Sequence, residues 1–326
     1  MKVLLTGGAG YIGSFVAREL TARGHAVLVL DNLSTGRREA IPDTALDVAD
    51  IRDGDAVMRS FARFRPDSLI HFAALKSPEE SMSDPARYFE VNVSGTVNLL
   101  AAAARYGVER FVFSSSAAVY GTPQVCPVDE TAPAGPQSPY GESKYLGERM
   151  IESQSATTGM RFACLRYFNA AGAATDGSLG EFAHEGSRQL VPQAVAVARG
   201  LLPRLQIFGA DYPTSDGTAV RDYIHVEDLA EAHVRVTEGL DRPERSGTYN
   251  LGQGRGTSVL EVTGELRRIS GAEIPMEFAA RRAGDPAVSW ADVGLVQRTF
   301  GWAARRDLQD ILSSAWAWHT GVTAEA

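Results

Sequence analysis

The segment Lys2–Gly13 reads KVLLTGGAGYIG, an apolar run that passes directly into glycines. We expect a strand at Lys2–Thr6 and a helix at Tyr11–Ala22. Three glycines at fixed spacing, Gly7, Gly10 and Gly13, follow the strand and open the helix. Backbone N–H groups and a helix N-terminus meet a pyrophosphate at such a turn. The alternative is a tight strand–helix turn without a ligand, since G-x-x-G-x-x-G differs from the usual G-x-G-x-x-G.

Asp31 adds a second observation to this turn. It ends the next apolar run, 18 residues after Gly13, close to the position from which an acid binds an adenosine ribose. A carboxylate accepts hydrogen bonds from the ribose hydroxyls and repels a 2′-phosphate. The two features together predict an NAD site and disfavour NADP.

Apolar runs and amphipathic stretches alternate along the first half of the chain. Further strands are expected at Ala26–Asp31, Ser68–Phe72, Arg110–Ser115 and Arg161–Tyr167. Further helices are expected at Asp53–Phe64, Pro85–Arg105 and Pro139–Thr157. This alternation predicts an α/β fold, a doubly wound parallel-sheet Rossmann domain.

The pattern loosens after Gly172, which predicts two domains. Residues 1–172 would bind NAD, and residues 173–326 would form a smaller mixed α/β lobe, with segments near 220–252 packing back on the first domain. Elements expected in the second part are helices Leu190–Arg199 and Val226–Gly239 and strands Leu205–Phe208 and Thr248–Leu251. Loops are expected at Gly177–Gly186, a mobile one, and at Ala280–Asp285.

Composition narrows the function classes. The 326 residues carry a formal charge of −8 without a basic run, so a nucleic-acid partner is not expected. The only cysteines, Cys126 and Cys164, lack metal-ligand spacing, so we expect no metal. No apolar stretch approaches the roughly 20 residues that cross a bilayer, and the N-terminus lacks a secretory pattern. We therefore expect a cytoplasmic protein without membrane contact.

Tyr140 and Lys144 are the clearest candidates for chemistry. They lie four residues apart on one expected helix, so both side chains point the same way. One ammonium about 4 Å away supplies roughly the 4 kcal/mol that brings a phenol pKa from about 10 to near 7. Ser116 follows an expected strand at the sheet edge where α/β proteins bind ligands, although either serine before it could point inward instead. The alternative is an exposed helix face that carries no chemistry.

These motifs and others identify a resemblance. The sequence resembles the extended short-chain dehydrogenases/reductases, and among them most closely the UDP-glucose 4-epimerases. The matching segments span Lys2 to Asp285 and are TGGAGYIGS, DNLSTGRR, HFAALK, NVSGTVNLL, FSSSAAVYG, PQSPYGESK, LRYFNAAGA, IFGADYPTSDGTAVRDYIHVEDLA, YNLGQG and RRAGD.

The resemblance implies the residues of the site. The cofactor NAD would be lined by the glycine turn and by Tyr11, Ile12, Asp31, Asn32, Asp50, Ile51, Lys76, Asn92, Tyr140, Lys144 and Phe168. A UDP-sugar would face Ser116, Tyr140, Asn169, Leu190, Phe208, Arg221, Arg282, Asp285 and Ser289. Two departures are a shorter segment before Asp50 and Gln189 in place of the usual asparagine beside Leu190. The resemblance also implies a homodimer through the helices expected at Pro85–Arg105 and Pro139–Thr157.

The two residues after Ser116 help to distinguish epimerisation from dehydration. Nucleotide-sugar dehydratases of this family use an acid pair there, whereas Ala117 and Ala118 cannot move a proton. The resemblance therefore implies 4-epimerisation of UDP-galactose and UDP-glucose through a 4-keto sugar. Ser289 stands where a tyrosine would exclude an N-acetyl group, which also predicts activity on UDP-GlcNAc and UDP-GalNAc, unless another residue fills the space. The alternatives are a UDP-glucuronate 4-epimerase and a non-catalytic NAD-binding sensor.

Overall fold

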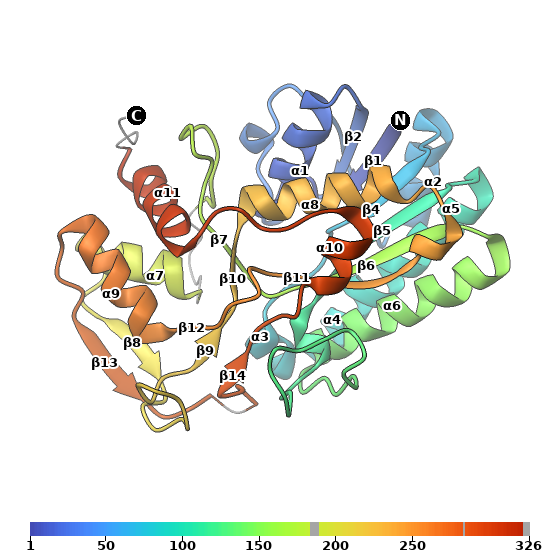
Figure 1. Cartoon of the computed structure of the whole chain (residues 1–326). Coiled ribbons are helices and arrows are strands. Elements are labelled where there is room, and N and C mark those ends of the chain that lie inside the picture. The colour runs from blue at the N-terminus through green and yellow to red at the C-terminus, as the bar shows by residue number, and fades with distance from the viewer. Residues whose placement is uncertain (183–188, 283, 322–326) are drawn as a thin grey trace.

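A parallel sheet of seven strands forms the central layer, in the order β11-β6-β5-β4-β1-β2-β3 (Figure 1). The structure is a computed structural model that describes residues 1–182, 189–282 and 284–321. The strands are β1 (Lys2–Thr6), β2 (Ala26–Asp31), β3 (Ala45–Val48), β4 (Ser68–His71), β5 (Arg110–Ser116), β6 (Arg161–Tyr167) and β11 (Gly247–Leu251). The expected fold class is confirmed, and the five strands expected in the first half end within one residue of their expected bounds.

Successive strand residues point to opposite faces and create two cores. Val3 and Leu5 pack with the helices of one face, whereas Leu4 packs with those of the other. The first face carries α1 (Tyr11–Ala22) and α8 (Val226–Gly239), and the second carries α2 (Gly54–Phe64), α5 (Gly95–Tyr106) and α6 (Pro139–Thr158). A continuous apolar run such as VLL is therefore buried on both sides, as parallel sheets require.

The long helix expected at Pro85–Arg105 contains a wider turn. The structure has α4 (Pro85–Phe89), a π-helix (Glu90–Ser94) and α5 in direct succession. Asn92, at the centre of the π-helix, binds the backbone of Leu75 through both side-chain atoms, with Leu75 N–H to Oδ1 at 2.8 Å and Nδ2 to the Leu75 carbonyl at 3.0 Å. The side-chain amide thereby joins the π-helix to the segment after β4. Such single π turns recur at functional sites.

A smaller lobe contains most of the second half of the chain. Its core joins α7 (Leu190–Ala198), α9 (Val259–Ser270) and α11 (Leu308–Thr320) to a parallel pair, β8 (Leu205–Phe208) and β13 (Met276–Ala279). Short strands link the lobe to the large sheet region: β7 (Asn169–Ala171) with β10 (Tyr223–His225), and β9 (Val220–Arg221) between β12 (Thr257–Ser258) and β14 (Val288–Ser289).

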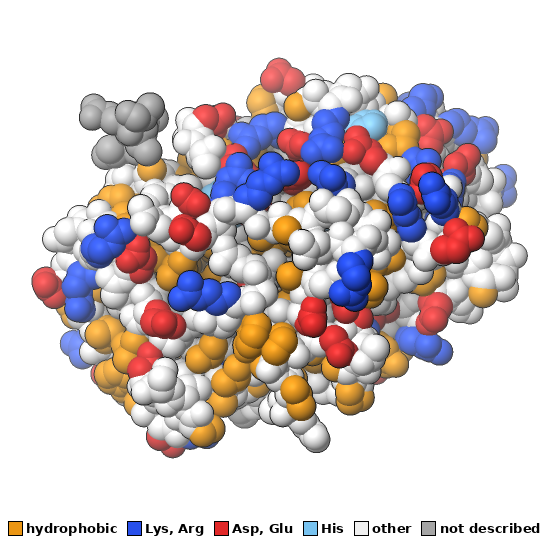
Figure 2. Space-filling view, in the orientation of Figure 1, with side chains coloured by type: hydrophobic (Ala, Val, Ile, Leu, Met, Phe, Trp, Pro, Cys, Tyr) orange, Lys and Arg blue, Asp and Glu red, His pale blue; other side chains and the backbone are white. Residues whose placement is uncertain are grey.

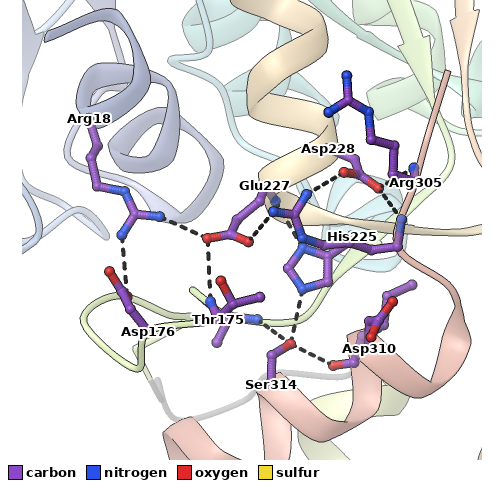
Figure 3. A network of polar contacts seen from close by, with 12 residues as sticks. Arg18, Thr175, Asp176, His225, Glu227, Asp228, Arg305, Asp310 and Ser314 are labelled. Atoms are coloured by element: carbon purple, nitrogen blue, oxygen red, sulfur yellow. Dashed lines mark hydrogen bonds and ion pairs between the residues drawn. The ribbon is translucent and has the colours of Figure 1, made fainter. Parts of the chain in front are cut away.

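Polar contacts at the start of α8 connect the two halves (Figure 3). Arg18 of α1 donates to Glu227 at 3.1 Å, and the same carboxylate accepts from the Thr175 N–H at 3.3 Å. His225, directly before α8, contacts Ser314 of α11 at 3.1 Å. A single helix N-terminus is thereby bonded to the first helix of the chain and to the last described one.

Several elements differ from the sequence expectations. The strand β3 was not predicted, because its ALDV sequence is only partly buried and lacks a long apolar run. Helices α3 (Pro78–Ser83), α9, α10 (Gly294–Phe300) and α11 were not predicted either. Of the loop expected at Gly177–Gly186, residues 183–186 lie outside the described residues, as does Ala283 in the loop expected at Ala280–Asp285.

Three buried histidines are expected to make the fold acid-sensitive. Burial lowers the pKa of His71 to about 3 and those of His225 and His233 to about 4. Near pH 6.5 the unfolded chain begins to bind protons that the folded chain excludes, so stability falls as the pH drops toward 4. Each histidine should contribute on the order of 3 kcal/mol to this loss, measurable by urea unfolding. His225→Asn, which keeps an acceptor at the start of α8, should reduce the dependence; an unchanged dependence would contradict its assignment.

The surface carries charged side chains of both signs (Figure 2). On the face shown in Figure 2, basic and acidic side chains are interspersed. Within residues 1–182, 189–282 and 284–321, no helix is long and apolar enough to cross a membrane. The same ranges contain no group of three or more His, Cys, Asp or Glu side chains placed to hold a metal ion.

Candidate active site

The glycine turn after β1 leaves room only for backbone. Gly7 has a φ of +70°, and a Cβ there would lie 2.5 Å from the Ala73 nitrogen. A Cβ on Gly13 would lie 2.3 Å from the Gly7 carbonyl oxygen. Gly10 precedes α1 and offers no side chain to cap it. The N-terminus of this 12-residue helix, which begins with Tyr11 and Ile12, therefore fits the pyrophosphate of a dinucleotide.

Asp31 lies at the end of β2, beside the glycine turn. Its carboxylate accepts the N–H groups of Ala9 at 3.0 Å and Leu33 at 2.9 Å. Burial raises the pKa of Asp31, and these two hydrogen bonds oppose the shift. The side chain thus orders the turn, and its charge lies where a ribose would approach the strand end.

Replacement of Asp31 by alanine is expected to weaken NAD retention by about tenfold, because a charged acceptor and the order of the turn are both lost. The measurement is the ratio of NAD to protein after gel filtration, determined by chromatography of the released dinucleotide. Asp43→Asn, which changes an exposed carboxylate, is the control. An unchanged ratio for Asp31→Ala would remove Asp31 from cofactor binding.

Asn32, Asp50 and Ile51 lie beyond the same strand end. Asn32 Nδ2 donates to Asp50 at 3.0 Å. Hydrogen bonding by Arg52 lowers the pKa of Asp50 to about 2. Ile51 is buried and packs against Gly95, so its side chain belongs to the core. Only the backbone of Ile51 is therefore left to contact a cofactor.

Tyr140 and Lys144 project from the first turns of α6. Ser138 caps this helix by accepting the Gly141 N–H at 3.1 Å. Both side chains are buried, with exposed fractions of 9% and 4%. Lys144 Nζ donates to the Ser114 carbonyl at 2.8 Å and lies 5.0 Å from the centre of the Phe113 ring. The helix thus places a phenol and an amine together at the carboxyl end of β5.

Burial shifts the pKa values of Tyr140 and Lys144 in opposite directions. Burial raises the pKa of Tyr140, and a hydrogen bond with Ser116 only partly offsets it. Burial also lowers the pKa of Lys144 to about 7. The expectation that one ammonium by itself brings the phenol pKa near 7 is therefore not met, because the pKa of Tyr140 shifts upward. Desolvation is the largest cause of the shift for both groups.

The three serines at the end of β5 have separate partners. Ser114 Oγ lies 2.5 Å from the Tyr167 hydroxyl, and Ser115 Oγ donates to Glu148. Ser116 is the serine that bonds to Tyr140. Its Oγ also accepts the Ala118 N–H at 3.1 Å. Among the three, Ser116 therefore points toward the phenol.

The other residues expected around the cofactor come from the π-helix, from α1 and from the segments that follow β4 and β6. Asn92 binds the Leu75 backbone and donates to Ser143 of α6 at 2.9 Å. Lys76 lies 3.7 Å from the Glu181 carboxylate. Phe168 is half-buried between β6 and β7. The Tyr11 hydroxyl donates to the Gly172 carbonyl at 2.6 Å, which ties the glycine turn to the segment after β7.

The residues expected around the sugar nucleotide form two groups. Arg221 of β9 pairs with Asp285 and lies opposite Ser289 of β14 in the three-stranded sheet. The guanidinium of Arg282 lies 3.9 Å from the centre of the Phe208 ring. Two more expected residues are the exposed Asn169 in β7 and the half-buried Leu190 at the start of α7.

Several buried or half-buried polar residues near these groups were not expected. Glu148 follows Lys144 by four residues, a helical spacing that could have revealed it. Tyr167 directly precedes Phe168 within a segment that carries the resemblance. Asp222 is fully buried and accepts the N–H groups of Gln253 at 2.7 Å and Gly254 at 3.0 Å. No local pattern signals such long-range contacts.

Residues 3–252 match the NAD dependent epimerase/dehydratase family. The chain belongs to this family. Within the NAD-dependent epimerase/dehydratase family, the UDP-glucose 4-epimerase of Lacticaseibacillus casei is 43% identical, over 98% of this chain and 97% of that protein. The expected resemblance is confirmed.

Solved structures of family members superpose closely on this fold. A UDP-glucose 4-epimerase from Stenotrophomonas maltophila, with bound NAD and formylated UDP-arabinopyranose, has a TM-score of 0.95 and 44% identity, with 98% of each chain covered. The UDP-Glc/GlcNAc 4-epimerase from Campylobacter jejuni has a TM-score of 0.86 and 39% identity, covering 98% of this chain and 99% of that one. The fold is thus shared by family members named for different sugar substrates.

Proposed function

We propose that the protein is an NAD-dependent 4-epimerase that interconverts UDP-galactose and UDP-glucose through a transient 4-keto sugar. The observation that carries the proposal is the buried Tyr140–Lys144 pair, with Ser116 bonded to the phenol, on a chain that is 43% identical to a UDP-glucose 4-epimerase. When bound beside this pair, NAD would supply the hydride acceptor and donor for sugar C4. The protein's own task is to move one proton and hold the sugar.

Tyr140 exchanges that proton. Its hydroxyl, with Ser116 beside it, takes the proton of the sugar 4-OH and later gives it back. Because burial opposes ionisation of the phenol, a positive charge must be close when the proton moves, and Lys144 supplies one. The 3₁₀ turn Ala117–Val119 follows with apolar side chains, so no acid pair is present there to eliminate water.

The remaining contacts would hold the two ligands. The glycine turn with Tyr11, Ile12, Asp31, Asn32, Asp50, Lys76, Asn92 and Phe168 would bind NAD. Arg221 and Arg282 would make charge-assisted hydrogen bonds to the diphosphate. Asn169, Leu190, Phe208, Asp285 and Ser289 would line the uridine and sugar. In this arrangement residues 1–172 would form the NAD-binding domain and residues 173–326 the UDP-sugar-binding lobe, with segments near 220–252 packing back on the first domain. The first domain would add Ser116, Tyr140 and Asn169 to the sugar site.

We infer that the protein works as a cytoplasmic homodimer. The face of α5 presents Val97, Ala101 and Ala104 to solvent, spaced four and three residues apart. Small apolar side chains at this spacing form one stripe and allow close helix approach. The mass of the protein in solution, measured by light scattering, tests this inference, and a monomer would contradict it.

The test of the proposed function is conversion of UDP-galactose to UDP-glucose by purified protein without added NAD, followed by chromatography. A cofactor regenerated in each cycle needs no external supply, so turnover should continue over many cycles. Parallel reactions with UDP-glucuronate and with UDP-GalNAc measure the substrate range. Turnover of UDP-glucuronate alone would replace the proposed substrate, and bound NAD without any turnover would indicate a sensor.

A further inference from the structure

A buried ion pair lies directly behind Lys144. Glu148, one helical turn farther along α6, is 5% exposed, and Arg166 of β6 is 6% exposed. Arg166 donates to both carboxylate oxygens, with Nε to Oε1 at 2.8 Å and Nη2 to Oε2 at 2.5 Å. Removing two charges from water is costly, and apolar residues of similar size would often stabilise a fold equally well. The pair therefore calls for a role beyond holding α6 on the sheet.

The same carboxylate reaches the end of β5. Ser115 Oγ donates to Glu148 Oε1 at 2.5 Å. Ser115 stands between Ser114, whose carbonyl binds Lys144 Nζ at 2.8 Å, and Ser116, which bonds to Tyr140. Glu148 thus fixes Ser115. The residues on either side of Ser115 contact the amine of Lys144 and the phenol of Tyr140. A shift of this carboxylate would move both contacts together.

Arg166 also has contacts other than those with Glu148. The Arg166 guanidinium lies 4.7 Å from the centre of the Tyr120 ring. The Tyr120 hydroxyl donates to Asn250 Oδ1 of β11 at 2.7 Å. The position of Glu148 is therefore set by three neighbouring strands, which makes the carboxylate a rigid reference for Lys144.

The charge of Glu148 acts on Lys144 as well. Burial lowers the pKa of Lys144, and the Glu148 carboxylate is the charge that opposes this shift. His71 of β4 faces Lys144 and is neutral, because burial lowers its pKa to about 3. Other titratable or charged groups lie near the pair and near Tyr140: Cys164 and Tyr167 of β6, Tyr120 after β5, Glu130, and Tyr145, Arg149 and Glu152 of α6.

We propose that Glu148 is a positioning residue for the 4-epimerisation: with Arg166 and Ser115 it holds the Lys144 ammonium against the Ser114 carbonyl and keeps it charged while Tyr140 exchanges its proton with the sugar. This inference rests on the proposed function for its kinetic part. The state of Lys144, in contrast, can be measured without any turnover.

The lysine content makes that measurement direct. The chain contains three lysines, Lys2, Lys76 and Lys144. Labelling lysine with carbon-13 at Cε therefore gives three resonances, and the one missing from Lys144→Arg belongs to Lys144. In Glu148→Gln the Lys144 resonance should titrate about one pH unit lower than in the unchanged protein. Lys2 and Lys76 should titrate as before.

The kinetic readout separates positioning from binding. In Glu148→Gln the alkaline limb of kcat should move down by the same about one unit, while KM for UDP-galactose changes by less than about threefold. Glu152→Gln is the matched control, because Glu152 lies on the same helix with 57% of its side chain exposed, paired with Arg149 at 2.8 Å. It should leave both the Lys144 titration and kcat unchanged.

A second variant separates the effect of Glu148→Gln on Lys144 from its effect on protein stability. Glu148→Gln leaves the buried Arg166 charge unpaired, which can destabilise the protein strongly. The double variant Glu148→Gln/Arg166→Met removes both charges, so it should regain stability while Lys144 still titrates low. Recovery of stability together with the original Lys144 titration would overturn the proposal, as would an unshifted Lys144 in Glu148→Gln. Absence of epimerase activity in the unchanged protein would contradict the proposed function alone, because the titration of Lys144 would still be measured.

Discussion

Replacing Tyr140 by phenylalanine is expected to lower kcat for UDP-galactose about a thousandfold, roughly 4 kcal/mol of transition-state stabilisation. The change removes the one hydroxyl that can take the 4-OH proton and leaves the ring to fill the buried position at the start of α6. NAD should stay bound, because the glycine turn and Asp31 are untouched. The measurements are kcat by chromatography of the product and the ratio of NAD to protein.

Tyr145→Phe is the matched control for this variant. Tyr145 lies on the same helix, is half-buried and lines a hollow beside Glu148, Arg149 and Arg166. Loss of its hydroxyl should leave kcat within about twofold of the original value. If Tyr140→Phe kept a near-normal kcat, the proton would have to be exchanged by another group, and Tyr140 would lose its assigned role.

Introducing tyrosine at Ser289 should close the sugar pocket to N-acetyl groups. Ser289 is 8% exposed and pairs with Arg221 across the short sheet, so a phenol ring there has to project from a crowded strand. We expect Ser289→Tyr to lower kcat/KM for UDP-GalNAc about a hundredfold while that for UDP-galactose falls no more than about fivefold. Competing both substrates in one assay measures the ratio.

A small substitution at the same position provides the control. Ser289→Ala removes only a hydroxyl and should preserve activity on both substrates. Equal losses on the two substrates in Ser289→Tyr would show that the variant damages the site in general. No conversion of UDP-GalNAc by the unchanged protein would mean that another side chain already fills the space.

Local sequence patterns predicted much of the fold and the centre of the site. Continuous apolar runs located the five expected strands because each is buried by helices on both faces. The four-residue spacing of Tyr140 and Lys144 predicted that both lie on one side of α6, and both side chains are buried in the structure. In these cases the residues of one strand or one helix are enough for the prediction, and no contact with a distant segment is needed.

Features that depend on distant partners were not predicted. Arg221 meets Asp285 across 64 residues, and the strands of the sheet that holds Arg221 contain two residues each. The π-helix around Asn92 depends on the Leu75 backbone, which no helical pattern encodes. The raised pKa of Tyr140 depends on how deeply α6 is buried, and spacing alone cannot measure desolvation.

The place of β11 in the large sheet limits how the chain can be divided. This strand comes from the second half of the sequence, yet it pairs in parallel with β6 and forms one border of the sheet. A fragment that stopped after β7 would leave β6 with an open row of N–H and C=O groups, which invites aggregation. The half of the chain that we propose binds NAD therefore does not form a complete sheet alone, and a chimera with another epimerase has to include Gly247–Leu251.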